Sequence, residues 1–251
     1  MSGMNVIRRK LRRLKQKLKV NGKIKTCKML TKNTLQFIRE LRENNHKAWF
    51  DENRHRYEEV KKDYHRLIGE ILLKMQNFDK SLSLLQVKDC TFRINRDIRF
   101  SKDKTPYKTH LSIIMSPYGK RMEFAAYYVH LDEQAGSFAG GGIYMPGSEA
   151  LKKIRAEISG FYEDLEDILN SEDFAKTFHG LDSEGNIVLT RPPKGYDADH
   201  PAIDLLKYKS FTATKPLDDK LLTDPKGVDV VIEILKKIKP LNDFINRGLT
   251  T

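Results

Sequence analysis

The sequence predicts a single α+β domain over residues 29–251, in which an antiparallel sheet packs with several amphipathic helices. Two patterns indicate this fold class. Apolar residues recur at spacings of three, four and seven near both ends of the region, whereas between residues 92 and 144 they tend to alternate with polar residues. No linker rich in Pro, Gly or Ser and no internal repeat divides the region, so one domain is the simplest organisation.

The helical spacing predicts two helices ahead of the sheet. Thr31 or Asn33 can cap the first, and the second extends from about Ala48 to Phe78 with its apolar side chains on one face. Ser148 is a suitable cap for a helix that extends to about Leu169. Further helices are predicted over residues 173–178, 203–206 and 228–244.

The alternating segments predict the strands, which cover residues 92–100, 110–117, 122–132, 137–144, 187–190 and 210–214. The second and third of these are joined at Tyr118-Gly119, a turn that favours an antiparallel hairpin. Three glycines, Gly140 to Gly142, lie within the fourth. Because the residues of a phosphate-binding loop do not follow them, they indicate a bulge or a close backbone approach.

Residues 92–108 concentrate charge within the predicted sheet, since six Lys or Arg residues surround Asp97 and Asp103. On an extended strand Arg96 falls on the face that carries the apolar side chains. A guanidinium buried there must be paired, because losing its water without a partner costs several kcal/mol. We therefore expect a carboxylate to meet Arg96, or a bulge near Asn95 to turn it outward.

This stretch is the main candidate site, because Arg and Lys beside a strand suit phosphate or carboxylate ligands. The predicted ligand-binding residues are Arg93, Arg96, Arg99 and Lys108, and the predicted catalytic residues are Asp97, Lys104 and Tyr107. Asp97 would orient a guanidinium or accept a proton, and Tyr107 would donate a hydrogen bond. The alternative is structural, with the charges forming an internal ion-pair network.

A second polar cluster lies in the loop over residues 191–201, where Arg191 and Lys194 are further candidate ligand-binding residues. Prolines stiffen this loop, although an ordinary surface crossing has the same composition. Asp199-His200 has no identifiable nucleophile beside it. The histidines His46, His55 and His65 are not spaced as helical metal ligands, and no metal site is predicted.

The net charge of +12 is unevenly distributed. Residues 1–28 hold eleven Lys or Arg and no acidic residue, so residues 29–251 carry 35 basic against 34 acidic groups. The predicted domain is therefore close to neutral, and its charge gives no argument for nucleic-acid binding. Residues 1–28 are a basic arm that binds nucleic acid, an amphipathic helix that contacts an anionic membrane, or an extension upstream of a start at Met29.

Cys27 and Cys90 show neither metal-ligand spacing nor a disulfide framework, which favours a reducing, cytoplasmic setting. No apolar run approaches the length of a membrane span.

The pattern Arg93-x-x-Arg96-Asp97-x-Arg99-Phe100-x-x-Asp103-Lys104-x-x-Tyr107 resembles the signature of a bacterial family of about 230 residues, catalogued as a conserved domain of unknown function. The resemblance extends from about Met29 to the C-terminus. It includes the segments Gly140 to Tyr144 and Arg191 to Tyr196. It indicates which residues to examine and implies no activity.

Two functions follow from these patterns. The first is binding of, or chemistry on, an anionic, phosphate-bearing small molecule, and the second is a non-enzymatic structural or protein-interaction module. The patterns identify no cofactor, and they do not decide whether the protein is an enzyme.

Overall fold

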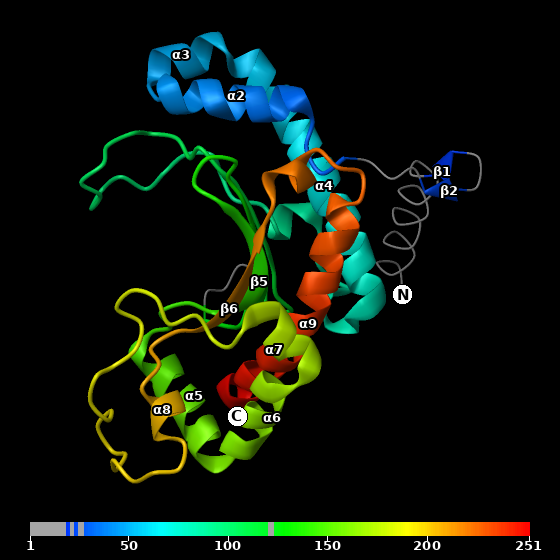
Figure 1. The fold of residues 1–251 in the computed structure, drawn as a ribbon. Coiled ribbons are helices and arrows are strands. Elements are labelled where there is room, and N and C mark those ends of the chain that lie inside the picture. The colour runs from blue at the N-terminus through cyan, green and yellow to red at the C-terminus, as the bar shows by residue number, and fades with distance from the viewer. Residues whose placement is uncertain (1–18, 21–22, 25–27, 120–122) are drawn as a thin grey trace, which may run out of the picture.

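The chain is described by a computed structural model, which places residues 19–20, 23–24, 28–119 and 123–251 (Figure 1). The fold is α+β, as the sequence predicts, and is built on one antiparallel sheet of order β3-β4-β5-β6. Its strands are β3 (Leu111–Met115), β4 (Ala126–Leu131), β5 (Ser137–Ile143) and β6 (Phe211–Leu217). The predicted basic arm lies largely outside the described residues, apart from the paired strands β1 (Lys19–Val20) and β2 (Lys23–Ile24).

The helices precede, interrupt and follow the sheet in the chain. They are α2 (Lys32–Glu43), α3 (Lys47–Glu52), α4 (Arg54–Phe78), α5 (Ser148–Gly160), α6 (Tyr162–Asn170), α7 (Glu172–Phe178), α8 (Ile203–Leu206) and α9 (Gly227–Thr250). Short 3-10 helices cover Lys80–Leu82, Val87–Asp89 and Asp219–Leu222. None of the described helices is long and apolar enough to cross a membrane. Two long predicted helices are each divided, one at Asn53 and the other at Phe161.

Helix α2 begins as the sequence predicts. The Thr31 hydroxyl accepts a hydrogen bond from the Thr34 backbone N–H at 3.2 Å, which satisfies one of the donors that a helix start leaves unpaired. Asp63 on α4 extends this cap, because its carboxylate accepts from the Thr31 N–H at 2.8 Å and from the Thr34 hydroxyl at 2.7 Å. The cap therefore fixes α2 to α4 as well as starting the helix.

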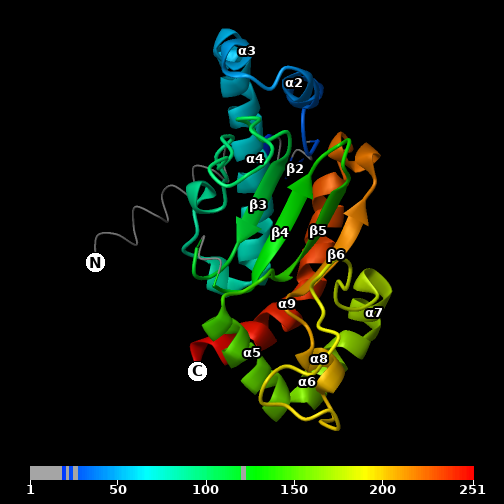
Figure 2. The same cartoon turned by 90° about the vertical axis from the view of Figure 1, so that its left-hand side faces the viewer.

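The sheet has one covered face and one open face. Figure 1 shows the sheet nearly edge-on, with α4 and α9 on one side, and Figure 2 looks onto the other side. Ile113, Val129 and Ala139 are fully buried on the covered face, where they join the main core with Leu235 and Ile238 of α9. Because side chains alternate along a strand, every second residue points to the open face.

The three consecutive glycines allow β5 to lie against its neighbours. A Cβ on Gly140 would come within 2.1 Å of the Ala213 carbonyl oxygen, and one on Gly142 within 2.0 Å of the Phe211 oxygen. Gly142 also has a φ of +105°, which L side chains rarely adopt. The predicted close backbone approach is confirmed, and its partner is β6.

The predicted strand over residues 92–100 is wrong. Residues 91–108 instead form an irregular hairpin, here called the ribbon, which is held by isolated bridges from Thr91 to Ile113 and from Asn95 to Tyr107. Ile94 is buried, but Phe100 near the tip is 96% exposed. The alternating pattern failed because no neighbouring element packs over the far half of the ribbon. The short strand predicted over residues 187–190 is likewise reduced to one bridge, from Val188 to Tyr208.

The base of the ribbon is anchored by a second, smaller core. It consists of Phe37, Leu41, Phe50, Val60, Ile94 and Tyr107, and it joins α2, α3 and α4 to the ribbon. Tyr107 stacks on Phe50 with ring centroids 4.1 Å apart. Both backbone groups of Tyr107 also bond to the Asn45 side chain, at 2.9 and 3.0 Å. The ribbon is thus fixed at its base and exposed at its tip.

Candidate functional site

The open face of the sheet is the candidate functional site. In Figure 1 it lies between two long loops, the blue-green ribbon at one end and the yellow segment around residues 185–200 at the other. The register places Ser112 opposite His130 and Ile114 opposite Tyr128, so these four side chains share the open face. The loops therefore flank a surface that the sheet itself holds rigid.

A cleft of about 490 Å³ occupies the middle of this face. This volume is within the range of small-molecule sites. Its walls are mainly aromatic and apolar. Its polar groups include two carboxylates, Asp182 and Glu184, from the segment after α7, and hydroxyls of β4 and β6. The lining residues include Phe92, Ile114, Tyr128, Phe138, Thr212 and Asp182. Gly141 and Gly142 also line it, so β5 contributes little side-chain bulk there.

A short chain of polar contacts runs from the cleft toward the ribbon. The Tyr128 hydroxyl donates to Ser112 Oγ at 2.9 Å, and Ser112 Oγ lies 3.2 Å from His130 Nδ1. The His130 ring stacks on Phe138 with centroids 5.0 Å apart and lies 4.6 Å from the His110 ring. Two imidazoles and two hydroxyls therefore lie together on adjacent strands.

Asp132 follows β4 and is fixed by the turn that leads to β5. Its Oδ1 atom accepts from the backbone N–H groups of Gln134 and Ala135, each at 3.0 Å, and from Arg42 of α2 at 2.6 Å. Burial acts to raise the pKa of Asp132, but the hydrogen bonds from Ala135, Arg42 and Gln134 outweigh it and hold the pKa below its usual value. Asp132 is consequently a carboxylate at neutral pH.

The two imidazoles are uncharged at neutral pH. Burial and the neighbouring His130 ring lower the pKa of His110 to about 4. Burial also lowers the pKa of His130, with a small opposing effect from Asp132. Each ring therefore keeps one nitrogen lone pair at neutral pH.

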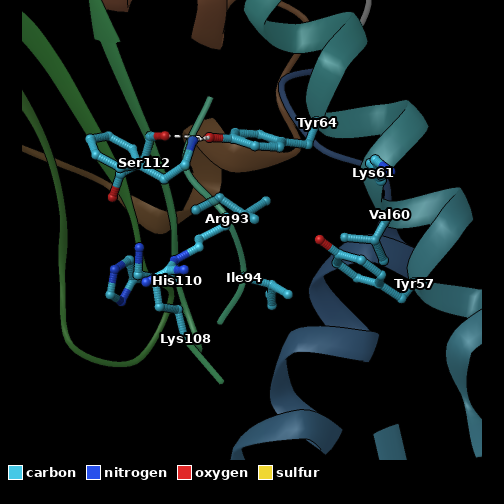
Figure 3. A pocket seen from close by; sticks show the side chains of 11 residues that line it. Tyr57, Val60, Lys61, Tyr64, Arg93, Ile94, Lys108, His110 and Ser112 are labelled. Atoms are coloured by element: carbon cyan, nitrogen blue, oxygen red, sulfur yellow. Dashed lines mark hydrogen bonds between the residues drawn. The ribbon is translucent and has the colours of Figure 1, made fainter. Parts of the chain in front are cut away.

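Arg93 and Lys108 form the positive part of the site. Figure 3 shows them beside His110, in a hollow between the ribbon and α4 that they line with Phe92 and Ser112. The Lys108 ammonium lies 5.2 Å from the centroid of the Phe92 ring. Burial and the charge of Arg93 lower the pKa of Lys108. Phe92 lines both this hollow and the central cleft, so its side chain lies where the two adjoin.

Neither cation forms an ion pair within the described residues, although the charge of Arg93 reaches Asp97 and helps to lower the pKa of that carboxyl. Among the described residues, no carboxylate lies within ion-pair distance of Arg93 or of Lys108. The hollow is closed at its inner end by the Tyr64 hydroxyl of α4, which donates to the Ser112 carbonyl oxygen (Figure 3).

A protein-family profile described as conserved hypothetical protein (DUF2461) matches residues 33–244. The chain belongs to this family. The match extends from the start of α2 to within α9, so the sheet, the ribbon and the open face all belong to the DUF2461 unit. None of the curated proteins and none of the solved structures compared with the chain matches it.

The DUF2461 ribbon holds most of the residues predicted for the site. In its outer half, two of the predicted arginines pair with carboxylates of the same segment. Arg96 bonds to Asp103 and to Thr105, so the expected carboxylate partner of Arg96 exists. Arg99 makes a two-pronged contact with Asp97 at 3.0 and 2.7 Å. Both pairs are local to the tip.

The other predicted residues are spread out. Lys104 donates to the Ile98 carbonyl oxygen at 2.9 Å on the exposed tip. Tyr107 is buried against Phe50 in the smaller core. Arg191 and Lys194 are exposed on the loop at the opposite end of the open face. Of the predicted set, the structure brings Arg93 and Lys108 together, in the hollow between the ribbon and α4.

His200, which the sequence flagged beside Asp199, contacts Ser159 without forming a nucleophile–base pair. Its Nε2 lies 2.9 Å from Ser159 Oγ, and its Nδ1 accepts from the Ala202 N–H at 3.0 Å. Because Nδ1 is an acceptor, the proton of the neutral ring is on Nε2. The ring therefore donates to Ser159 and is not placed to remove its proton.

Sequence reasoning missed the cluster of His110, Ser112, Tyr128, His130 and Asp132. The signal is present, because these residues occupy every second position on two strands predicted to form a hairpin. Applying the strand period to both strands at once would have placed them on one face.

Proposed function

We propose that this DUF2461 chain binds an anionic, phosphate-bearing small molecule on the open face of its sheet. Arg93 and Lys108 supply the positive charge. The observation that carries the proposal is that these two cations lie together without a carboxylate partner in the described chain, whereas Arg96 and Arg99 have one each.

The two unpaired cations are energetically unfavourable in the absence of a ligand. Lys108 is partly buried beside another cation, and both effects lower its pKa. Placing the partly buried Lys108 beside the exposed Arg93 costs free energy that an anion recovers on binding. Arg93 can give two parallel hydrogen bonds to a phosphate, and Lys108 adds a point charge.

The adjoining cleft provides for the rest of the ligand. Phe92, Tyr128 and Phe138 present ring surfaces, and Tyr128 and Thr212 present hydroxyls. This combination of an apolar wall, a few polar groups and a charged rim is typical of a pocket for a small molecule. It favours a ligand with a planar or apolar part joined to the phosphate.

The tip of the ribbon fits the alternative function. There the Arg96–Asp103 and Arg99–Asp97 pairs satisfy the charges locally, as an internal ion-pair network would. We therefore assign the tip pairs to holding the shape of the ribbon, and the anion site to Arg93 and Lys108.

The test is a ligand screen with a charge-matched control. The parent chain, the Arg93→Ala/Lys108→Ala variant and the Arg99→Ala/Lys102→Ala variant are melted with inorganic phosphate, nucleotides and sugar phosphates, all in EDTA. A ligand at 100 times its Kd stabilises by about 2.7 kcal/mol, or roughly 5–11 °C for a chain of this size.

We expect one ligand class to raise the midpoint of the parent and of the tip variant, but not that of the Arg93/Lys108 variant. Isothermal titration of that ligand then gives its Kd. The proposal is refuted when no phosphate compound shifts the parent, or when the shift survives in the Arg93/Lys108 variant.

A further inference from the structure

We infer that His110, His130 and Asp132 form a binding site for a divalent transition-metal ion such as Zn²⁺. The potential ligand atoms of these three residues all lie within 4.8 Å of one another. Within the described ranges, no other group of three His, Cys, Asp or Glu side chains comes together in this way. The inference stands independently of the anion site.

The strand register creates the cluster. Pairing of Leu111 with Leu131 and of Ser112 with His130 places His110 opposite Asp132, one step beyond the paired residues. His130 is diagonal to His110 and lies two residues before Asp132 on the same strand. All three positions face the open side of the sheet. A cluster held by adjacent hydrogen-bonded strands keeps its backbone spacing, so only side-chain rotation is needed to adjust it.

The distances suit a site that closes around an ion. Zinc bonds to His nitrogen and carboxylate oxygen at roughly 2.0–2.2 Å, so ligand atoms in a tetrahedral site lie roughly 3.4 Å apart. The present separations of up to 4.8 Å exceed that by little more than 1 Å, and rotation of the two imidazoles can close the gap.

Asp132 is already oriented like a ligand. Its three hydrogen bonds from Arg42, Gln134 and Ala135 all go to Oδ1. Across the described residues, no donor bonds to Oδ2. One oxygen is thus fixed by the fold while the other is left for a further partner. Metal-bound carboxylates are commonly hydrogen-bonded in this way.

His130 also has the outer contact that a ligand histidine needs. Ser112 Oγ lies 3.2 Å from Nδ1, and a hydroxyl that accepts the Nδ1 proton leaves the Nε2 lone pair for a metal. The His110 ring lies against that of His130 at a tilt of 39°, but it makes no hydrogen bond within the described part of the chain. The contacts with Arg42 and the turn would suffice for a purely structural role of Asp132. Such a role would not explain why two imidazoles lie beside it.

The ligand set indicates the class of ion and its role. Imidazole nitrogens with one carboxylate suit zinc and neighbouring transition metals better than Mg²⁺ or Ca²⁺. Three protein ligands leave coordination positions open, as catalytic zinc sites do. Those positions face the open side near Arg93 and Lys108, so the ion would add positive charge where the anion is proposed to bind.

The test uses the metal alone, in buffer free of phosphate. Zinc is added to the chelator-treated full chain, bound metal is counted by mass spectrometry after gel filtration, and the Kd is measured by competition with a chromophoric chelator. The variants are His110→Ala, His130→Ala and the double variant, with His55→Ala as the control because His55 is exposed on α4. Circular dichroism checks that each variant folds.

We expect one zinc ion per chain in the parent and in His55→Ala, and binding at least tenfold weaker in each His110 and His130 variant. Zinc should also raise the melting midpoint of the parent but not that of the double variant. Failure of the parent to bind zinc overturns the inference. Equal affinity in the double variant overturns it as well. Since no phosphate compound is present, neither result depends on the anion site.

Discussion

Two arginines on one face of α2 offer a sharp test of how Asp132 is held. Arg42 donates to Asp132, to the Gln134 side chain and to the Thr109 carbonyl oxygen, and its side chain is 28% exposed against 6% for Asp132. Arg39, nearly one turn earlier, makes a two-pronged pair with Glu133 on the surface, where the exposures are 52% and 25%. The two pairs differ mainly in burial.

The expected losses follow from that difference. Arg42→Ala removes a charge-assisted hydrogen bond from a buried carboxylate that keeps two backbone donors, so it should lower the free energy of unfolding by about 2–3 kcal/mol. For a chain of this size the melting midpoint should fall by roughly 4–12 °C. Arg39→Ala should cost about 0.2–1 kcal/mol, as exposed pairs do.

Urea unfolding followed by circular dichroism measures the free energy of unfolding of both variants. The dependence of that free energy on urea concentration should be the same in each. A double-mutant cycle with Asp132→Asn should give a coupling energy of about 1 kcal/mol or more for Arg42 and about zero for Arg39. Equal losses in the two single variants, or a loss under 1 kcal/mol in Arg42→Ala, would contradict the reasoning from burial.

Two further outcomes are expected. Gly140→Ala should lower the free energy of unfolding by about 3 kcal/mol or more, because its Cβ would meet the Ala213 backbone at 2.1 Å. Gly160→Ala at the end of α5 meets open space, so it should raise the free energy of unfolding by about 0.5 kcal/mol. Thermal melts decide this, and equal midpoints would refute it. Burial acts to raise the pKa of Asp63, but its hydrogen bonds from Thr31 and Thr34 and its contact with Arg66 hold it below the usual value. Its contribution to stability is then complete above about pH 4–5 and is lost as pH falls through the lowered pKa, so the stability difference between the parent and Asp63→Asn should shrink between pH 6 and 3. An unchanged difference would contradict this.

The regular elements could be predicted because each carries a local signal. The Thr31 cap, the apolar stripe of α4 and the turn at Gly119 each depend on residues close together in the chain. The hairpin of β3 and β4 was found for the same reason. The ribbon was not, since its alternation of Ile94, Ile98 and Phe100 requires a neighbour that the fold does not provide.

The site was only partly predictable, because it depends on register. Arg93 and Lys108 were identified from charge, although their proximity results from the backbone pairing of Ile94 with Lys108 across the ribbon. The His110–His130–Asp132 cluster requires knowing that β3 ends at Met115 and β4 begins at Ala126. The intervening segment is longer than a two-residue turn, so turn chemistry does not set the register.

The path of the chain through the sheet also governs how the molecule reaches its native state. Strands β5 and β6 are paired along their full length, yet residues 144–210, with α5 to α8, lie between them. Helix α9, which covers β5, follows later still. During synthesis β5 is therefore complete long before its neighbour and its cover exist, and its edge is open to other chains. Contacts this distant in sequence slow folding, so the pairing of β5 with β6 is a late step.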